Sequence, residues 1–319
     1  MEQLVRTVPG DFGAAVASGL SQRPKVIPAR FFYDHRGSEL FEQITALPEY
    51  YPTRTEIGLL RAHADDIARL CGGLRNVVEF GSGSSAKTPL LLDAVDAAAY
   101  VPIDISEEFL AAAAGEIAAA YPGLTVVPVA GDFTHPIRLP AGLADAPALG
   151  FFPGSTIGNF GPSAAVDLLR SLAATLGLDA RLVIGIDLRK NPRLLEAAYD
   201  DAAGVTADFN LNLLHRINRE LDGTVPVEAF EHRAVWHDGL GRIEMHLVAT
   251  RDVVFTVAGR RFAMTAGETI HTENSHKYRI EEARMLARTS GWEPMAIWTD
   301  AEELFSLQVW AAAPRRLEP

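Results

Sequence analysis

The chain has 319 residues, enough for one large domain or two ordinary ones, and its 48% hydrophobic and 22% charged residues are typical of a folded globular protein. A formal net charge of −12 argues against non-specific binding to nucleic acid, and the single cysteine, Cys71, excludes an internal disulfide and a cysteine-rich metal site. No apolar run approaches the roughly 18 residues that a membrane span needs. The N-terminus also lacks the pattern of a signal peptide, so we expect a cytoplasmic protein that does not bind a membrane.

The region before the first predicted strand is expected to be mainly helical. Apolar residues at helical spacing indicate helices over residues 38–44 and 56–70, the second capped by Thr55. The stretch between them holds Tyr50 and Tyr51 between two prolines, a pattern that does not fit the middle of a helix. We therefore predict a rigid, aromatic loop there.

From residue 76 the chain alternates strands and helices. Strands are predicted over residues 76–80, 99–104, 124–129, 148–152 and 181–187, and helices over 89–95, 107–120 and 164–176. Alternation of this kind predicts an α/β fold with a parallel, doubly wound sheet, in which ligands bind at the carboxyl ends of the strands.

The turn after the first of these strands reads Glu79-Phe80-Gly81-Ser82-Gly83 and leads into a helix. Its small residues let a ligand approach the backbone, and the helix N-terminus offers unpaired N–H groups. The two glycines are too close for a phosphate-binding loop, and Ala86 stands at the third glycine position of G-x-G-x-x-G. The pattern E-x-G-x-G after a strand instead resembles the first motif of S-adenosylmethionine-dependent methyltransferases, although an ordinary βα turn has the same composition.

Acidic residues follow the next two strands. Asp104 lies 23 residues after Gly81 and could accept hydrogen bonds from both ribose hydroxyls of an adenosine-containing cofactor. Asp132 and Phe133 could contact an adenine through carboxylate and ring, although each acid could also be an ordinary turn or cap residue. Together these features favour a nucleoside cofactor. S-adenosylmethionine is preferred over NAD because it carries no phosphate and the missing third glycine then matters less.

After residue 187 the pattern changes. Helices are predicted over 193–199 and 205–221, the second with Asn210, Asn212, Asn218 and Arg219 as unusual polar members. Antiparallel strands follow over 228–236, 242–249, 253–257 and 260–264, then a helix over 281–289 and strands over 292–298 and 305–312. We predict a helical N-terminal region plus a Rossmann-like cofactor domain over 1–190, an inserted α+β substrate-binding domain over 191–278, and a return to the first sheet over 279–319.

Five segments in order, residues 50–56, 79–88, 154–159, 199–206 and 272–275, resemble those of a known family. The chain is similar, from about residue 24 to its end, to the L-histidine Nα-methyltransferases of ergothioneine biosynthesis. The resemblance implies a class I methyltransferase sheet with an inserted domain, S-adenosylmethionine as cofactor, and three methyl transfers to the α-amine of histidine, giving hercynine.

The resemblance also implies roles for individual residues. The cofactor is expected on Gly81, Ser82, Gly83, Lys87, Asp104, Asp132 and Phe133. Substrate-binding residues are expected to be Asn159 and Tyr199 at the carboxylate, Glu273 and Ser275 at the imidazole, and Tyr33 and Met245 in the pocket wall. Tyr51 is expected to flank the amine and the reacting methyl as the catalytic residue, although the resemblance leaves the choice between Tyr50 and Tyr51 open.

Other interpretations of these residues remain open. Asn159 could cap the next helix, Tyr199 could be a packing residue, and Glu273 and Ser275 could lie on a strand edge. The substrate could be another amino acid, such as one with an indole ring, and the protein could be a regulator that binds the cofactor without turnover or an NAD-dependent oxidoreductase. The histidines show no H-x-x-x-H or similar spacing, so no metal is expected. We expect a monomer acting on a small molecule.

Overall fold

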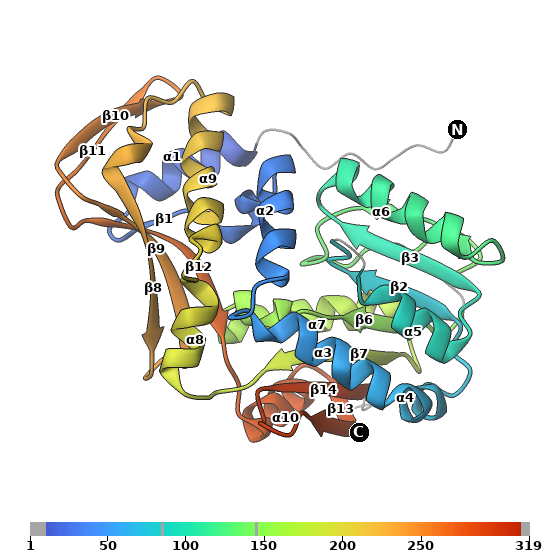
Figure 1. Ribbon diagram of the computed structural model, residues 1–319. Coiled ribbons are helices and arrows are strands. Elements are labelled where there is room, and N and C mark those ends of the chain that lie inside the picture. The colour runs from blue at the N-terminus through green and yellow to red at the C-terminus, as the bar shows by residue number, and fades with distance from the viewer. Residues whose placement is uncertain (1–10, 84–85, 144–145, 314–319) are drawn as a thin grey trace, which may run out of the picture. The chain divides into compact units, whose positions relative to one another are not determined.

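The computed structural model describes residues 11–83, 86–143 and 146–313. Two compact units account for them: the first contains residues 52–189 and 277–313, and the second contains residues 11–51 and 190–276 (Figure 1). The N-terminal segment on which the expectation about a signal peptide rests, residues 1–10, lies outside the described residues. Among the helices of the described ranges, none has the length and apolar character needed to cross a membrane.

The first unit is built on a sheet with the strand order β13-β14-β7-β6-β2-β3-β4, in which β5 also pairs with β3. Its strands are β2 (Asn76–Phe80), β3 (Ala99–Asp104), β4 (Thr125–Val126), β5 (Val129–Ala130), β6 (Leu149–Phe152), β7 (Arg181–Asp187), β13 (Trp292–Thr299) and β14 (Phe305–Ala312). The strands from β2 to β7 pair in parallel, and β14 runs antiparallel to both β7 and β13. The predicted mostly parallel α/β sheet is therefore confirmed, except that the single strand expected over 124–129 is two short strands.

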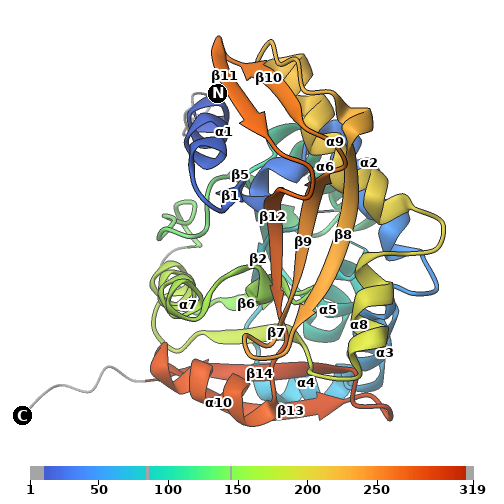
Figure 2. The ribbon, with the colours of Figure 1, turned by 90° about the vertical axis from the view of Figure 1, so that its left-hand side faces the viewer.

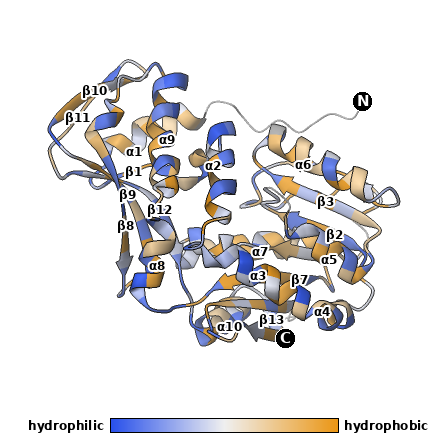
Figure 3. Cartoon of the chain, in the orientation of Figure 1, coloured by the Kyte–Doolittle hydropathy of each residue, from blue (hydrophilic) through white to orange (hydrophobic). Residues whose placement is uncertain are grey.

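Both faces of this sheet are covered. The helices of the unit are α3 (Tyr51–Ala62, from its second residue on), α4 (Ala64–Cys71), α5 (Thr88–Val95), α6 (Glu107–Ala120), α7 (Pro162–Leu176) and α10 (Ile280–Thr289). Neighbouring residues of a strand point to opposite faces, so Val77 joins the apolar cluster with α3, α4 and α5, whereas Val78 joins the cluster with α7 and α10. Helices such as α4 and α6 carry both hydrophilic and hydrophobic residues (Figure 3), as expected for helices with one side on a sheet.

The predicted aromatic loop is wrong in one respect. Helix α3 begins at Tyr51, so Pro52 lies in its first turn, where a missing backbone N–H is not needed for a helical hydrogen bond. Thr55 therefore lies inside the helix and does not cap it. Pro52 therefore marks the start of a helix and does not interrupt one.

The second unit contains helices and an antiparallel sheet. Its elements are α1 (Asp11–Ser21), β1 (Lys25–Val26), η1 (Ala29–Phe32), α2 (His35–Thr45), α8 (Pro192–Tyr199), α9 (Val205–Glu220), η3 (Val227–Ala229), β8 (Phe230–His237), β9 (Arg242–Ala249), β10 (Val253–Val257), β11 (Arg260–Met264) and β12 (Thr269–His276). The main sheet has the order β1-β12-β9-β8, and β10 pairs with β11 as a separate hairpin. Figure 2 shows β8, β9 and β12 side by side.

The division of the chain differs from the predicted one in the N-terminal region. The predicted division assigns all of 1–190 to the cofactor domain, whereas residues 11–51 group with residues 190–276 in the structure. The cause is tertiary pairing: β1 joins β12 in parallel, and Phe41 of α2 packs against Phe209 of α9 with ring centroids 6.1 Å apart. The return to the first unit comes at Lys277, two residues before the predicted boundary.

Candidate cofactor and substrate sites

The glycine turn after β2 has a backbone that requires its glycines. Gly81 has φ +74° and Gly83 has φ +44°, both in the left-handed region that side chains disfavour. The Gly81 N–H donates to the Ile103 carbonyl at 2.8 Å, which fixes the turn to β3. Ser82 is buried, and its Oγ has no hydrogen-bond partner among the described residues. A buried hydroxyl without a partner is costly, and a polar ligand atom at the turn would satisfy it.

Asp104 stands beside this turn, at the end of β3. Its Oδ2 accepts a hydrogen bond from the Gly83 N–H at 3.3 Å, and its Oδ1 accepts one from the Ser106 N–H at 3.0 Å. Burial raises the pKa of the Asp104 carboxyl, and these backbone donors partly offset that effect. Ser106 is the residue before α6, and its side chain makes no capping hydrogen bond. The carboxylate thus lies where hydroxyl donors of a ligand at the turn could reach it.

An aromatic ring borders the same turn. A Cβ atom on Gly81 would lie 3.7 Å from Cε1 of Phe133, and that ring packs edge-on against Phe80 and Phe152 at centroid distances of 6.2 and 5.9 Å. The neighbouring Asp132 uses Oδ1 to accept from the backbone N–H and the hydroxyl of Thr134. The structure therefore groups Gly81, Ser82, Gly83, Asp104 and Phe133, and these residues fit an adenosine-type group: a glycine backbone, an orphaned hydroxyl, an acid and an aromatic face.

Lys87 is engaged in an ion pair inside the first unit. Its Nζ lies 2.5 Å from Oε2 of Glu56, whose side chain is fully buried, and the Gly154 N–H donates to the same Glu56 oxygen at 2.9 Å. A Cβ on Gly185 would lie 1.9 Å from the Glu56 carboxylate, so a larger residue there would displace the Glu56 side chain. Glu56 thus ties the lysine after the glycine turn to the loop after β6. The predicted helix over 56–70 begins at Glu56, and nothing in that pattern indicates this role.

That loop also carries Asn159. The residue is half-buried at the end of the short helix η2 (Thr156–Asn159). Gly161, not Asn159, is the N-cap residue of α7, so the helix-cap interpretation of Asn159 does not hold. Its predicted role at the substrate carboxylate stays a prediction.

Glu79, the acid of the E-x-G-x-G pattern, is buried beneath the turn. Its Oε2 accepts hydrogen bonds from the Tyr100 hydroxyl at 2.6 Å and the Thr88 hydroxyl at 2.7 Å. Burial raises the pKa of the Glu79 carboxyl to about 7, although both hydroxyls oppose the shift. The motif acid therefore connects β2, β3 and the start of α5 from within the core.

In the second unit, four of the predicted substrate-binding residues come together. Glu273 of β12 pairs with Met245 of β9, and Ser275 pairs with Ile243, so these side chains share one face of the sheet. The Tyr199 hydroxyl, at the end of α8, donates to Ser275 Oγ at 2.8 Å. The antiparallel pairing of β9 and β12 therefore brings together residues that are far apart in the sequence.

The aromatic residues of the second unit separate Tyr50 from Tyr51. The Tyr50 ring lies edge-on to Phe41 and to Tyr199, each at 6.3 Å, and Tyr33 lies edge-on to Phe41 at 5.6 Å. Tyr51, by contrast, accepts a hydrogen bond from Lys190 Nζ at 2.6 Å. Tyr50 thus adjoins Tyr199, and Lys190 is a polar neighbour of Tyr51 that no sequence pattern indicated.

One cluster of metal-ligand type was missed by the spacing argument. Ligand atoms of Glu244, His246 and His271 lie within 4.8 Å of one another, because His246 and His271 are cross-strand partners. Both carboxylate oxygens of Glu244 are already engaged, one by Arg242 at 2.5 and 2.8 Å and the other by His246 Nε2 at 3.0 Å. The guanidinium supplies the cation, so the cluster is an ion-pair network.

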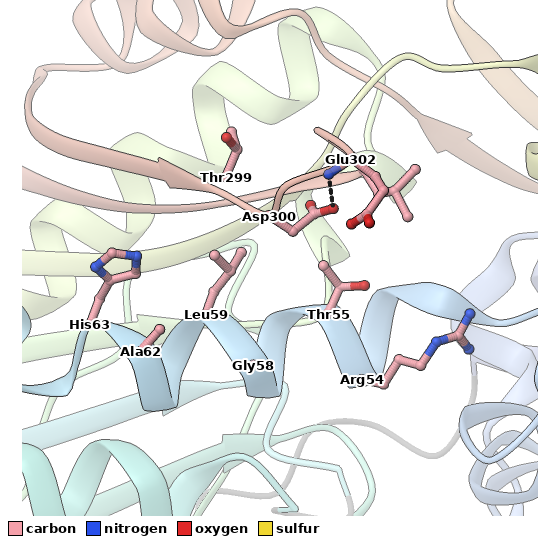
Figure 4. Close-up of a pocket in the computed structure, with 10 residues that line it drawn as sticks. Arg54, Thr55, Gly58, Leu59, Ala62, His63, Thr299, Asp300 and Glu302 are labelled. Carbon is pink, nitrogen blue, oxygen red and sulfur yellow. Dashed lines mark hydrogen bonds between the residues drawn. The ribbon is translucent and has the colours of Figure 1, made fainter.

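A cavity of about 520 Å³ opens in the first unit between α3 and the turn from β13 to β14 (Figure 4). Thr55 and Leu59 of α3 and His63, directly after it, line one side, and Thr299 and Asp300, at the end of β13, line the other. None of the predicted site residues lines it. The cavity is therefore a feature separate from the glycine turn.

The sheet order, with β14 inserted antiparallel between β7 and β13, and the glycine turn with its acid and ring define a class I S-adenosylmethionine-dependent methyltransferase. The family described as "Histidine-specific methyltransferase, SAM-dependent" matches residues 12–312, so the chain belongs to that family. The protein is thus an enzyme of the transferase class with S-adenosylmethionine as its cofactor.

Individual relatives extend this result. The chain is 41% identical over 304 residues to a histidine N-alpha-methyltransferase of Mycolicibacterium smegmatis, and the match covers 92% of each chain. It is 31% identical over 291 residues to ergothioneine biosynthesis protein 1 of Neurospora crassa, covering 88% of this chain and 32% of that protein. It is 27% identical to a 4-dimethylallyltryptophan N-methyltransferase of Claviceps purpurea, covering 89% of this chain and 90% of that one.

Proposed function

We propose that this enzyme transfers three methyl groups from S-adenosylmethionine to the α-amino group of L-histidine and so forms hercynine, the first step of ergothioneine biosynthesis. The observation that carries the proposal is the grouping of Glu273, Ser275 and Tyr199 on one face of the β9–β12 pair, in a chain whose family is histidine-specific. We also propose that the enzyme is cytoplasmic, has no nucleic-acid partners and acts as a monomer. Light scattering of the purified protein would check the monomeric state.

The cofactor is proposed to lie against the turn at residues 81–83. Asp104 accepts hydrogen bonds from its ribose hydroxyls, the Phe133 ring lies against the adenine with Asp132 nearby, and the orphaned Ser82 hydroxyl bonds to one of its polar atoms. S-adenosylmethionine supplies a methyl group already activated on a sulfonium, so the reaction requires neither a metal nor a covalent nucleophile. The protein therefore has to bind and orient the two reactants and to exclude water from them.

The substrate is proposed to be held at its two ends. Glu273 offers a charge-assisted hydrogen bond to an imidazole N–H and Ser275 a hydroxyl, while Asn159 and Tyr199 bind the carboxylate by neutral hydrogen bonds. Met245 and Tyr33 line the pocket. A polar pair at the ring suits imidazole and poorly suits an indole, which favours histidine over a tryptophan-like substrate.

The amine between these ends has to change its protonation state. An α-ammonium has no lone pair, so it first loses a proton to water, a carboxylate or a phenol such as Tyr51. The nitrogen lone pair then forms the new N–C bond, and the electrons of the C–S bond leave with the sulfur. Clamping the carboxylate and the ring leaves the amine free to rotate between successive transfers.

Mass spectrometry of products tests the proposal. Purified protein is incubated with S-adenosylmethionine and either L-histidine or L-tryptophan. We expect mono-, di- and trimethylated histidine to appear in succession, and little methylated tryptophan. Methylated tryptophan without methylated histidine would refute the assignment of the substrate.

A further inference from the structure

Asn210 is a fully buried amide on the apolar side of α9, where Leu213, Leu214 and Ile217 are also buried. Such a residue is costly unless its polar atoms are paired. Its Nδ2 donates to Nδ1 of His232 at 2.9 Å and to the backbone carbonyl of His246 at 3.2 Å. Its Oδ1 accepts from the Thr272 hydroxyl at 2.8 Å. Asn210 thus connects α9 to three strands, β8, β9 and β12.

Thr272 is the extra residue of a β-bulge. His271 pairs with His246, whereas Glu273 pairs with Met245, so Thr272 has no partner of its own in β9. Without the bulge, strict alternation would pair Glu273 with Glu244 and turn its side chain to the opposite face of the sheet. The bulge is therefore what places Glu273 and Ser275 on the face that carries Met245.

The Thr272 hydroxyl holds this bulge in place. Its Oγ1 lies 2.8 Å from Asn210 Oδ1 and 3.1 Å from the Met245 carbonyl, and its single proton serves these two acceptors. The side chain is 2% exposed, so water does not compete for the hydroxyl. Asn210 consequently fixes the point at which the register of β12 changes.

The same amide fixes the tautomer of His232. An amide NH₂ only donates, so Nδ1 of His232 accepts and the ring proton lies on Nε2. That nitrogen lies 2.7 Å from the backbone carbonyl of Tyr199, to which it donates. The orientation of the amide is set by the His246 carbonyl, which requires a donor facing it. One buried residue thus determines both the bulge before Glu273 and the backbone position of Tyr199.

We propose that Asn210, through Thr272 and His232, is the positioning residue that sets the substrate selectivity of the enzyme for amino acids with a small polar ring. Neither Asn210 nor Thr272 needs to touch the substrate: the amide aligns Glu273, Ser275 and Tyr199, which do. This inference rests on the proposed function, because it takes those three residues as the substrate contacts.

Two substitutions of similar size test the role of the hydroxyl. Thr272→Val removes it and keeps the shape, and Thr272→Ser keeps it. We expect Thr272→Val to weaken L-histidine binding about tenfold or more, which corresponds to about 1.4 kcal/mol, and to shift the histidine-to-tryptophan ratio of kcat/KM toward tryptophan. Thr272→Ser should keep the wild-type histidine affinity and the wild-type ratio of kcat/KM. Both variants should bind S-adenosylhomocysteine as the wild type does. Unchanged histidine affinity in a folded Thr272→Val protein would overturn the proposal.

Two measurements separate this inference from the proposed function. A crystal structure of Thr272→Val should show a changed register after His271, and an unchanged register overturns the positioning role whatever the activity. If the wild type methylates no histidine but the register changes in the variant, the substrate assignment fails and the positioning role stands. In the wild-type protein, ¹⁵N NMR should show His232 as the neutral Nε2–H tautomer, and the opposite tautomer would contradict the network without any variant.

Discussion

Nζ of Lys277 lies 2.6 Å from Oδ2 of Asp187, and both side chains are excluded from solvent, at 0% and 1% exposure. The backbone around this pair is also tied, because the Asp187 N–H donates to the Ser155 hydroxyl at 2.9 Å and the Asp187 carbonyl accepts from the Tyr278 N–H. Removing one partner leaves a buried charge unpaired and is strongly destabilising, whereas removing both charges together is much less so.

Lys277→Met should therefore lower the free energy of unfolding by about 3–5 kcal/mol, because it leaves the Asp187 carboxylate buried without its cation. Adding Asp187→Asn should recover most of that loss. Urea denaturation of the two variants measures this. Arg288→Met, which breaks an exposed ion pair with Glu293, is the control and should leave the unfolding midpoint unchanged. A Lys277→Met protein as stable as the wild type would contradict the described pair.

A second cycle tests whether Lys87 contacts the cofactor or only Glu56. Lys87→Met should destabilise the protein by about 3–5 kcal/mol because the Glu56 carboxylate is fully buried. In Glu56→Gln/Lys87→Met a neutral amide replaces the carboxylate, so stability should return. Titration of this double variant with S-adenosylhomocysteine separates the two roles. Restored affinity assigns Lys87 to the ion pair, and affinity still reduced despite restored stability assigns it to the cofactor.

Glu273→Ala should weaken L-histidine binding by a factor of about ten or more, because it removes a charge-assisted hydrogen bond. Binding of S-adenosylhomocysteine should change little. Isothermal titration of both ligands measures the two affinities. Glu231→Ala, at an exposed position of β8 in the same sheet, is the matched control. Parallel losses for both ligands in the Glu273 variant would count against a role at the imidazole.

Glu79 gives a pH-dependent prediction. Its pKa is about 7 in the folded protein and about 4.5 when unfolded, so the stability present below the unfolded pKa is lost as pH rises through the folded pKa. Glu79→Gln removes this dependence. The variant should gain about 2.5 kcal/mol of stability relative to the wild type between about pH 5 and about pH 8. Urea unfolding of both proteins at these two pH values measures the difference in their free energies of unfolding. A difference that does not change with pH would show that the Glu79 carboxyl titrates normally.

Much of the fold could be predicted because its signals are local. The bounds of β7, β9, β10, β11 and β14 follow from apolar alternation or continuous apolar runs and match the prediction. The sequence does not predict strand β12, because its residues are mostly polar and the bulge at Thr272 interrupts the alternation of buried and exposed positions. The grouping of residues 11–51 with the second unit depends on the pairing of β1 with β12, for which the sequence carries no local signal.

The candidate sites divide in the same way. Gly81, Gly83 and Asp104 lie at turns and strand ends, where residue type and position indicate a ligand, and the structure groups them. Asn210 stands out in the sequence as an unusual polar member of its helix, but its role and that of Glu56 could not be predicted, because each role depends on partners more than 20 residues away. Spacing arguments also missed the cluster around Glu244, whose members meet only across paired strands.

The position of the transferred methyl groups tests the central claim most directly. The enzyme is incubated with L-histidine and S-adenosylmethionine carrying a ¹³C-labelled methyl group, and the product is analysed by NMR. An imidazole held by Glu273 and Ser275 predicts that all label resides on the α-nitrogen, ending as a trimethylammonium group. Label on a ring nitrogen of histidine would contradict the proposed orientation of the substrate.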